Sequence, residues 1–162
     1  MRWLPLALLA YVMLGLQLGL GGLLKFHGGE MNLVLIAAVF IALNARRQTA
    51  VPVCFGLGLL HDFIGIGPLG TYALAYSLVA VLIAGTDRAL APEHPFTHFF
   101  VTLIAGVMVA FVVVIQGKYA RYGVHVDLWP SMIGAFYTAV IALPALWLLG
   151  RFRRAFRFRI GG

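Results

Sequence analysis

Charged residues are scarce in this sequence, and acidic residues are the scarcest. Only 10% of the 162 residues are charged, and just five are Asp or Glu. The surface of a soluble domain needs far more charge, whereas 62% of this chain is hydrophobic and the mean hydropathy is +0.98. The composition therefore excludes a soluble globular protein and predicts an integral membrane protein.

Cysteine and long polar segments are also nearly absent. Cys54 is the only cysteine, which excludes an intrachain disulfide and a multi-cysteine zinc site. We expect Cys54 to be a small buried apolar residue. Six spans of about 20 residues use nearly the whole chain, which leaves no room for a soluble catalytic domain.

Apolar windows predict an all-α protein, a bundle of six transmembrane helices. The windows cover residues 3–24, 31–45, 49–64, 69–86, 96–116 and 129–150. The second and third windows correspond to about 24 Å of helix each, so we expect these helices to tilt little or to end inside the protein. The first window lacks a persuasive cleavage site, so we predict a retained helix and not a signal peptide.

Lys and Arg divide unevenly between the two sides of such a bundle. One side has three of them, Lys25, Lys118 and Arg121. The other side has nine, namely Arg2, Arg46, Arg47, Arg88, Arg151, Arg153, Arg154, Arg157 and Arg159. The positive-inside rule then predicts a multi-pass protein with both termini in the cytoplasm. We therefore predict two parts of the chain, a six-helix transmembrane domain at residues 1–150 and a basic cytoplasmic tail at residues 151–162.

Small residues recur at helical spacing on two of the predicted helices. The first helix has Gly15, Gly19 and Gly22 on one strip. The fourth has a longer helix-docking face, which consists of Gly70, Ala73, Ser77, Ala80 and Ala84. Small side chains let helix backbones approach closely within a bilayer. Each strip is explained either by packing within the six-helix bundle or by the binding of a separate transmembrane partner.

The stretch GLGLLHDFIGIGPLG, residues 56–70, contains an isolated acidic residue, Asp62. A third helix that begins near Thr49 places Asp62 about 20 Å into the bilayer. Because a carboxylate facing lipid is costly, we expect Asp62 to face protein or water. Pro68 is predicted to lie in the first turn of the fourth helix, where backbone amides are free. The carboxylate of Asp62 is predicted to accept hydrogen bonds from these amides and so to fasten the turn.

Other roles are open for this pair of residues. Asp62 is alternatively a partner contact or a conformational element, or it takes part in ion or proton translocation. Translocation normally needs several buried ionisable groups in series, and the sequence shows no series. His61 is interpreted as a packed or interfacial histidine, with a metal ligand as the alternative. The surrounding glycines allow close packing followed by a sharp turn, and they are Gly56, Gly58, Gly67 and Gly70.

The carboxyl-terminal segment RFRRAFRFRIGG contains five arginines: Arg151, Arg153, Arg154, Arg157 and Arg159. Because the segment follows a membrane helix directly, we expect these arginines to bind anionic lipid head groups. An acidic cytoplasmic partner is the alternative. Interleaved aromatic and basic residues also occur in nucleic-acid-binding segments, but we expect no nucleic-acid partner here.

The sequence around Asp62 resembles the bacterial rod shape-determining MreD family. The resemblance lies in the runs at residues 56–63 and 67–74, GLGLLHDF and GPLGTYAL, and extends to the length, the six-span hydropathy and the arginine-bearing tail. It implies a noncatalytic subunit of the cell-elongation (rod) complex in the bacterial inner membrane. The implied direct partner is the bitopic protein MreC. The implied indirect partners are the MreB filament, RodA and its transpeptidase, which direct lateral peptidoglycan synthesis. The implied fold is similar to that of vitamin-transporter substrate-binding subunits (S-components).

Two other functions compete with the scaffold role. A substrate-binding transport subunit needs a few convergent polar groups, for which the candidates are Asp62, Tyr72, His125 and Asp127. An intramembrane enzyme is disfavoured because Ser77 and Ser131 lack a nucleophile motif. We therefore expect no catalytic residue, metal or cofactor.

Overall fold

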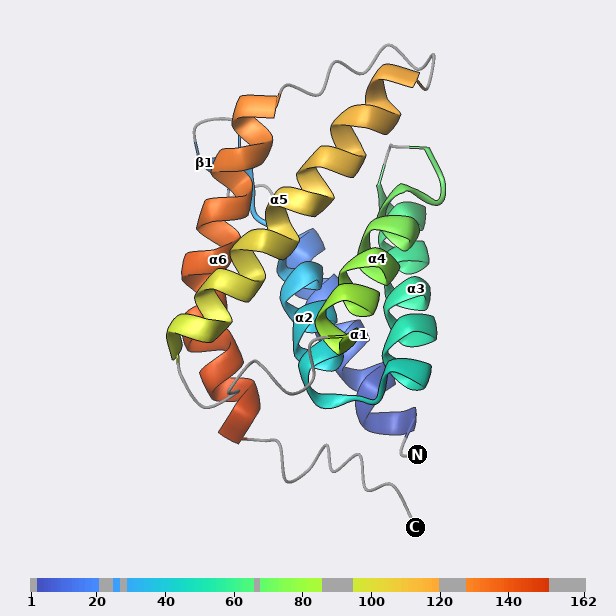
Figure 1. Cartoon of the computed structure of the whole chain (residues 1–162), viewed down its shortest axis with the longest axis vertical. Helices are drawn as coiled ribbons and strands as arrows, with labels where there is room; N and C mark the ends of the chain where they lie inside the picture. The colour runs from blue at the N-terminus through green and yellow to red at the C-terminus, as the bar shows by residue number, and fades with distance from the viewer. Residues whose placement is uncertain are drawn as a thin grey trace.

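The computed structural model describes residues 3–20, 25–26, 29–65, 68–85, 95–119 and 128–151. These residues form six helices and one antiparallel hairpin (Figure 1). The elements in chain order are α1 (Trp3–Leu20), β1 (Lys25–Phe26), β2 (Gly29–Glu30), α2 (Leu33–Asn44), α3 (Arg47–Ile64), α4 (Thr71–Gly85), α5 (Pro95–Tyr119) and α6 (Leu128–Arg151). The prediction of six helices is confirmed, and each predicted boundary is correct to within a few residues.

Successive helices run in opposite directions, so α1 begins and α6 ends at the same end of the bundle (Figure 1). The connection between α2 and α3, with Arg46, lies at that end, which we call the arginine end. The connection between α3 and α4 and the hairpin β1–β2 lie at the opposite end. We call this the aspartate end, because Asp62 lies in the last turn of α3.

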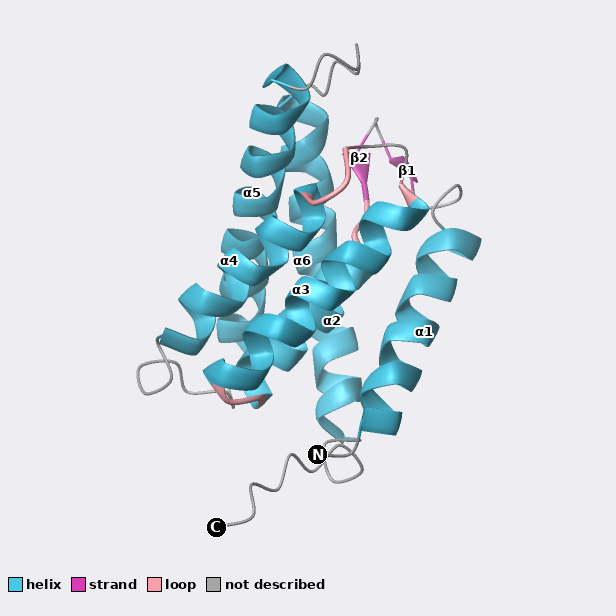
Figure 2. Cartoon of the chain, turned by 90° about the vertical axis from the view of Figure 1, so that its right-hand side faces the viewer, coloured by secondary structure: helices cyan, strands magenta, loops and turns pink. Residues whose placement is uncertain are grey.

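The short helix α2 is the centre of the bundle. It packs against all five other helices, whereas α1 and α5 lie on opposite sides in Figure 2. All residues from Leu33 to Ala42 are buried. A helix that is apolar all round is stable where protein surrounds it. With 12 residues, α2 is only about 18 Å long, well short of a bilayer core of roughly 30 Å. Its neighbours cover it.

Cys54 fills part of the contact between α3 and α2. Its side chain is fully buried, and Sγ lies 3.5 Å from the carbonyl oxygen of Ala38. The prediction of a small buried apolar residue is confirmed.

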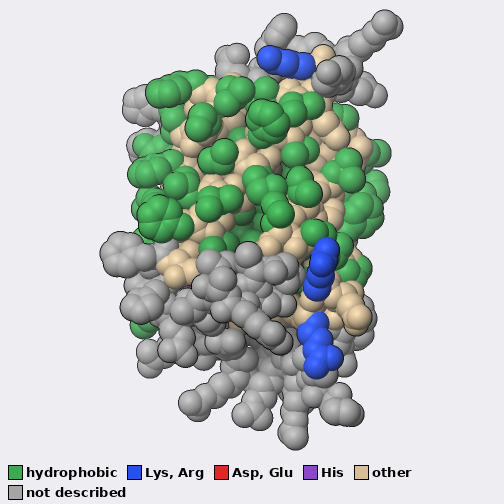
Figure 3. All heavy atoms as spheres, viewed as in Figure 1, with side chains coloured by type: hydrophobic (Ala, Val, Ile, Leu, Met, Phe, Trp, Pro, Cys, Tyr) green, Lys and Arg blue, Asp and Glu red, His purple; other side chains and the backbone are tan. Residues whose placement is uncertain are grey.

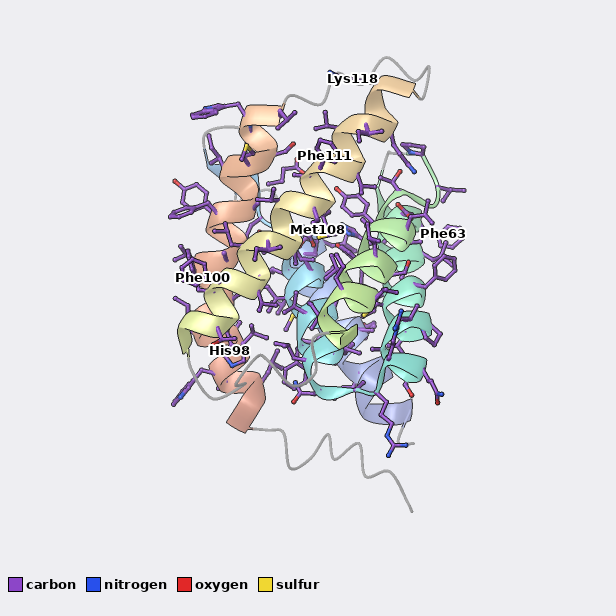
Figure 4. All side chains as sticks on the ribbon, viewed as in Figure 1. Phe63, His98, Phe100, Met108, Phe111 and Lys118 are labelled. Carbon is purple, nitrogen blue, oxygen red and sulfur yellow. The ribbon has the colours of Figure 1, made fainter. Side chains whose placement is uncertain are left out.

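Large apolar side chains cover the outside of the helices (Figure 3). Phe63 on α3 and Phe100 and Phe111 on α5 are labelled in Figure 4, and they are 71%, 57% and 59% exposed. Soluble monomers rarely expose apolar surface of this extent. Within the described chain, the stretches Thr97–Lys118 and Leu128–Leu149 are long and apolar enough to cross a membrane.

Polar and interfacial residues lie at the two ends of this apolar surface. Lys118 lies at the aspartate end of α5, and His98 lies near its other end (Figure 4). On α6, the exposed Trp129 and Trp147 lie near opposite ends of the helix, as suits amphipathic rings at two membrane interfaces. The outer surface therefore has the pattern that a bilayer requires.

The hairpin β1–β2 was not among the predicted elements, because its strands have only two residues each. Lys25 pairs with Glu30, and Phe26 pairs with Gly29. The hairpin lies close against α6 because Gly134 has no side chain. An added Cβ at this position would lie 2.6 Å from the carbonyl oxygen of Glu30. The sequence marks the turn between the strands, but the packing partner that stabilises them is a distant helix.

The glycine strip of α1 has a different environment from the one that packing within the bundle predicts. Gly15 and Gly19 are exposed, and an added Cβ at either position would meet no atom within 4 Å. Packing within the described chain therefore does not explain these two glycines. Gly22 lies outside the described residues.

Candidate functional site

Asp62 forms a cap on the first turn of α4. Its Oδ2 accepts hydrogen bonds from the amides of Gly70, at 3.0 Å, and Ala73, at 3.1 Å. Its Oδ1 accepts from the amide of Tyr72 at 3.0 Å. The carboxyl residue is only 4% exposed, so these amides replace water as its hydrogen-bond partners. The predicted bonds between Asp62 and the start of the fourth helix are present.

The turn before α4 completes this cap. Gly70 has a φ of +97°, a conformation that L side chains rarely adopt. The amide of Thr71 donates to the carbonyl oxygen of Pro68 at 3.4 Å, and the amide of Leu74 donates to that of Gly70 at 2.9 Å. Each amide from Gly70 to Leu74 therefore has an acceptor, although the first amides of a helix lack partners within it.

The predicted position of Pro68 was wrong. Pro68 was expected in the first turn of the fourth helix, but α4 begins at Thr71. The physical reason is that Gly70 reverses the backbone and Asp62 caps the chain directly after it. Pro68 instead supplies a carbonyl oxygen that accepts from the amide and, at 2.8 Å, from the hydroxyl of Thr71.

Gly58 sets the distance between α3 and α4. A Cβ at this position would lie 2.4 Å from Cα of Ala73 and 2.4 Å from the carbonyl oxygen of Tyr72. The two helices touch through their backbones here, one turn of α3 before Asp62. Gly56 behaves differently, because an added Cβ would meet nothing within 4 Å. Gly67 lies outside the described residues.

His61 packs against two tyrosines of α4. Its ring lies 4.1 Å from that of Tyr72, centroid to centroid, with an interplanar angle of 35°. Its Nδ1 lies 2.7 Å from the hydroxyl of Tyr76, and that hydroxyl donates to Oδ1 of Asn32 at 2.9 Å. The prediction of a packed histidine agrees with these contacts.

The hydrogen bonds of Asn32 determine the tautomer of His61. Oδ1 of Asn32 also accepts from the amide of Leu35 at 2.9 Å, so this atom is the oxygen of the side-chain amide and only accepts. Tyr76 must therefore donate to it. The Tyr76 hydroxyl has then no hydrogen left for His61, and Nδ1 of His61 must be the donor.

The same bonds continue into two further helices. The amide of Asn32 donates to Oγ1 of Thr138 on α6 at 3.0 Å. Gln17 of α1 donates to the carbonyl oxygen of Met31 at 2.8 Å and accepts from the amide of Leu33 at 2.7 Å. We call these side chains the polar network, and its members are Gln17, Asn32, His61, Tyr76 and Thr138. It ties α1, α3, α4 and α6 to the start of α2.

Sequence reasoning did not identify most of this network. A signal was present for Asn32, because Asn before an apolar run is typical of a helix N-cap. Gln17 also stands out as a lone polar residue in an apolar helix. Tyr76 and Thr138 carry no local signal, since their bonds depend on how distant helices pack.

The predicted docking face of α4 is used inside the bundle. Ala73 and Ala80 are fully buried, and Ser77 is half-buried with its hydroxyl bonded to the carbonyl oxygens of Ala73 and Leu74. These positions favour packing within the chain. The side chain of Ala84 lies outside the described residues.

The side chains of the predicted contact residues of the tail are not among those that the structure describes. Arg151 is the last residue of α6, and its side chain is not among those described. Arg153, Arg154, Arg157 and Arg159 lie outside the described residues. Their role as lipid or partner contacts stays a prediction.

Asp62 and Asn32 at the aspartate end use their side-chain oxygens to accept hydrogen bonds from backbone amides. Both oxygens of Asp62 accept backbone hydrogen bonds, and Asn32 caps α2. Within the described part of the chain, no three His, Cys, Asp or Glu side chains lie together as metal ligands would. This arrangement is suited to fixing the positions of helices.

The whole helical region matches one protein family. Residues 1–151 match the family described as rod shape-determining protein MreD. The chain belongs to the MreD family. The resemblance of the sequence around Asp62 to the MreD family is thereby confirmed, and the chain is a rod shape-determining membrane protein. No curated protein and no solved structure matches it, so the likeness of this MreD protein to vitamin-transporter subunits stays a prediction.

Proposed function

We propose that this MreD protein is a noncatalytic scaffold of the cell-elongation complex in the bacterial inner membrane. It works beside the bitopic protein MreC and, through MreC, with the MreB filament, RodA and its transpeptidase in lateral peptidoglycan synthesis. The observation that supports this proposal is the family match over residues 1–151. The capped hairpin and the polar network support it further, because they hold the helices in one arrangement.

The proposed orientation places the arginine end in the cytoplasm. The start of α1 and the end of α6 lie at that end (Figure 1), together with Arg46 and Arg47. Cytoplasmic loops of membrane proteins are enriched in Lys and Arg. In this orientation the tail arginines meet the anionic inner leaflet, where each contributes about 1 kcal/mol to membrane binding.

Affinity purification from native membranes in mild detergent tests the proposal. The expected result is recovery of a bitopic shape-determining protein together with the tagged chain. A variant with all five tail arginines changed to glutamine separates lipid contact from contact with an acidic partner, since only the latter would lower the recovery. Recovery of an ATPase transport module in place of the bitopic protein would overturn the scaffold role.

The transport alternative makes a separate demand on the same residues. A substrate-binding subunit needs free polar groups, whereas Asp62 already accepts three backbone hydrogen bonds. Native mass spectrometry of the purified protein distinguishes the two functions. A stoichiometric vitamin-sized molecule would contradict a purely scaffolding role.

A further inference from the structure

The net charge of this protein belongs to one of its ends. Chain order assigns nine Lys and Arg to the arginine end, against two acidic residues, Asp87 and Glu93 in the connection between α4 and α5. The aspartate end has three basic residues and three acidic ones, Glu30, Asp62 and Asp127. Counted by chain order, the excess of +7 therefore belongs to the arginine end.

Arg46 and Arg47 are the arginines of that end whose side chains the structure describes. Both are exposed, and neither guanidinium has an ion pair or hydrogen bond within the described part of the chain. Arg46 is the N-cap of α3 and has extended backbone angles, φ −63° and ψ 147°. The two side chains therefore leave the bundle where a helix begins, at the edge of its apolar surface.

The helix that begins here adds positive potential to the two cations. No side chain caps α3, and its first turn contains no acidic residue. The amides of Thr49 and Ala50 already donate to the carbonyl oxygen of Arg46, both at 2.8 Å. The amides of Arg47 and Gln48 precede them, at the positive end of the helix dipole.

The neighbouring end of α2 is partly satisfied by its own chain. The amide of Ala45 donates to the carbonyl oxygen of Ile41 at 2.8 Å, and Nδ2 of Asn44 donates to that of Phe40 at 2.7 Å. Two guanidinium groups and a helix N-terminus thus face the level of the lipid head groups. Guanidinium groups match phosphate oxygens in bidentate geometry.

We propose that Arg46 and Arg47, at the start of α3, bind the phosphate of an anionic phospholipid in the adjoining leaflet. This site is distinct from the tail arginines and deepens the lipid contact of the proposed function, since it rests on the same membrane orientation. The bound head group neutralises two cations that the described chain leaves unpaired. It also holds the α2–α3 connection at the membrane surface.

Native mass spectrometry of the full chain in mild detergent tests the site. The protein is mixed with phosphatidylglycerol or with neutral phosphatidylcholine, and the bound lipid is counted at several concentrations. At about 1 kcal/mol for each arginine, the double variant Arg46→Gln, Arg47→Gln should bind phosphatidylglycerol about 25-fold more weakly. Phosphatidylcholine binding should stay the same.

A matched control removes two charges from the other end. Lys118→Gln combined with Arg121→Gln should leave phosphatidylglycerol binding within twofold of the original chain. If the double arginine variant does not fold, Arg47→Gln alone should weaken binding about fivefold.

Four results would overturn the site, and the last of them comes from a separate tail variant. The first is equal weakening by the control pair, and the second is unchanged binding in both arginine variants. The third is complete displacement of the lipid by millimolar inorganic phosphate, which would indicate a small-anion site. A variant that lacks only the tail arginines separates this proposal from the proposed function. Loss of lipid in that variant alone would refute the Arg46–Arg47 site and leave the scaffold role intact.

Discussion

Replacement of Asp62 is the most direct test of the capped hairpin. Asp62→Leu removes three hydrogen bonds and leaves the amides of Gly70, Tyr72 and Ala73 without an acceptor. A buried amide without a partner costs about 1 to 3 kcal/mol. Water at the aspartate end satisfies part of this demand, so we expect the free energy of unfolding to fall by about 3 to 5 kcal/mol.

Asp62→Asn should cost much less. Asparagine caps helices about as well as aspartate, and its oxygen in the place of Oδ2 still accepts from Gly70 and Ala73. The lost negative charge and the single lost bond to Tyr72 amount to about 1 to 2 kcal/mol. The two variants should therefore differ by about 1 to 4 kcal/mol.

The assay is reversible unfolding in detergent combined with hydrogen exchange of backbone amides. In Asp62→Leu, exchange should accelerate at residues 70, 72 and 73 and stay slow in the centre of α2. Phe63→Leu is the matched control, because this neighbouring side chain is 71% exposed and its change should cost less than about 0.5 kcal/mol. Equal destabilisation by asparagine and leucine, or unchanged exchange at the three amides, would refute the cap.

Three further changes and one control test the helix contact at Gly58 and the polar network. Gly58→Ala should lower the unfolding free energy by about 1 to 3 kcal/mol, because its Cβ meets the backbone of α4. The open Gly15→Ala should leave it unchanged or raise it by up to about 1 kcal/mol, and equal effects of the two would refute the close approach. Tyr76→Phe should cost about 1 to 2 kcal/mol by breaking two hydrogen bonds, and an unchanged stability would show that the polar network contributes nothing. Gln17→Leu should speed amide exchange in α1 with little change in α4, and uniform acceleration throughout the bundle would contradict a local tether.

The sequence predicts the helices well because hydropathy acts locally. Each apolar window ends at a glycine, a proline or a charged residue, and these residues lie within a few positions of the observed helix ends. The partner of Asp62 was predictable for a similar reason. A buried carboxylate needs donors, and the nearest free donors in the chain are the amides at the start of the next helix.

What the sequence did not predict depends on distant packing. The apolar composition and short length of α2 single it out in the sequence, but they do not indicate which helices cover it. The bond from Asn32 to Thr138 joins residues 106 positions apart, which no local pattern encodes. The start of α4 was misplaced because the left-handed backbone at Gly70, and not the ring of Pro68, ends the turn.

Among the roles that its sequence position left open, the hydrogen bonds of Asp62 favour that of a structural cap. A carboxylate that carried protons or ions would have to exchange its partners in every cycle. Here that exchange would release three amides in a buried turn, at about 1 to 3 kcal/mol each, and would free the first turn of α4 from its cap. The rings of His61 and Tyr72 pack against each other beside this carboxylate, with their centroids 4.1 Å apart. A fixed acceptor stabilises one arrangement of α3 and α4, and a scaffold that presents constant surfaces to its partners depends on such an arrangement.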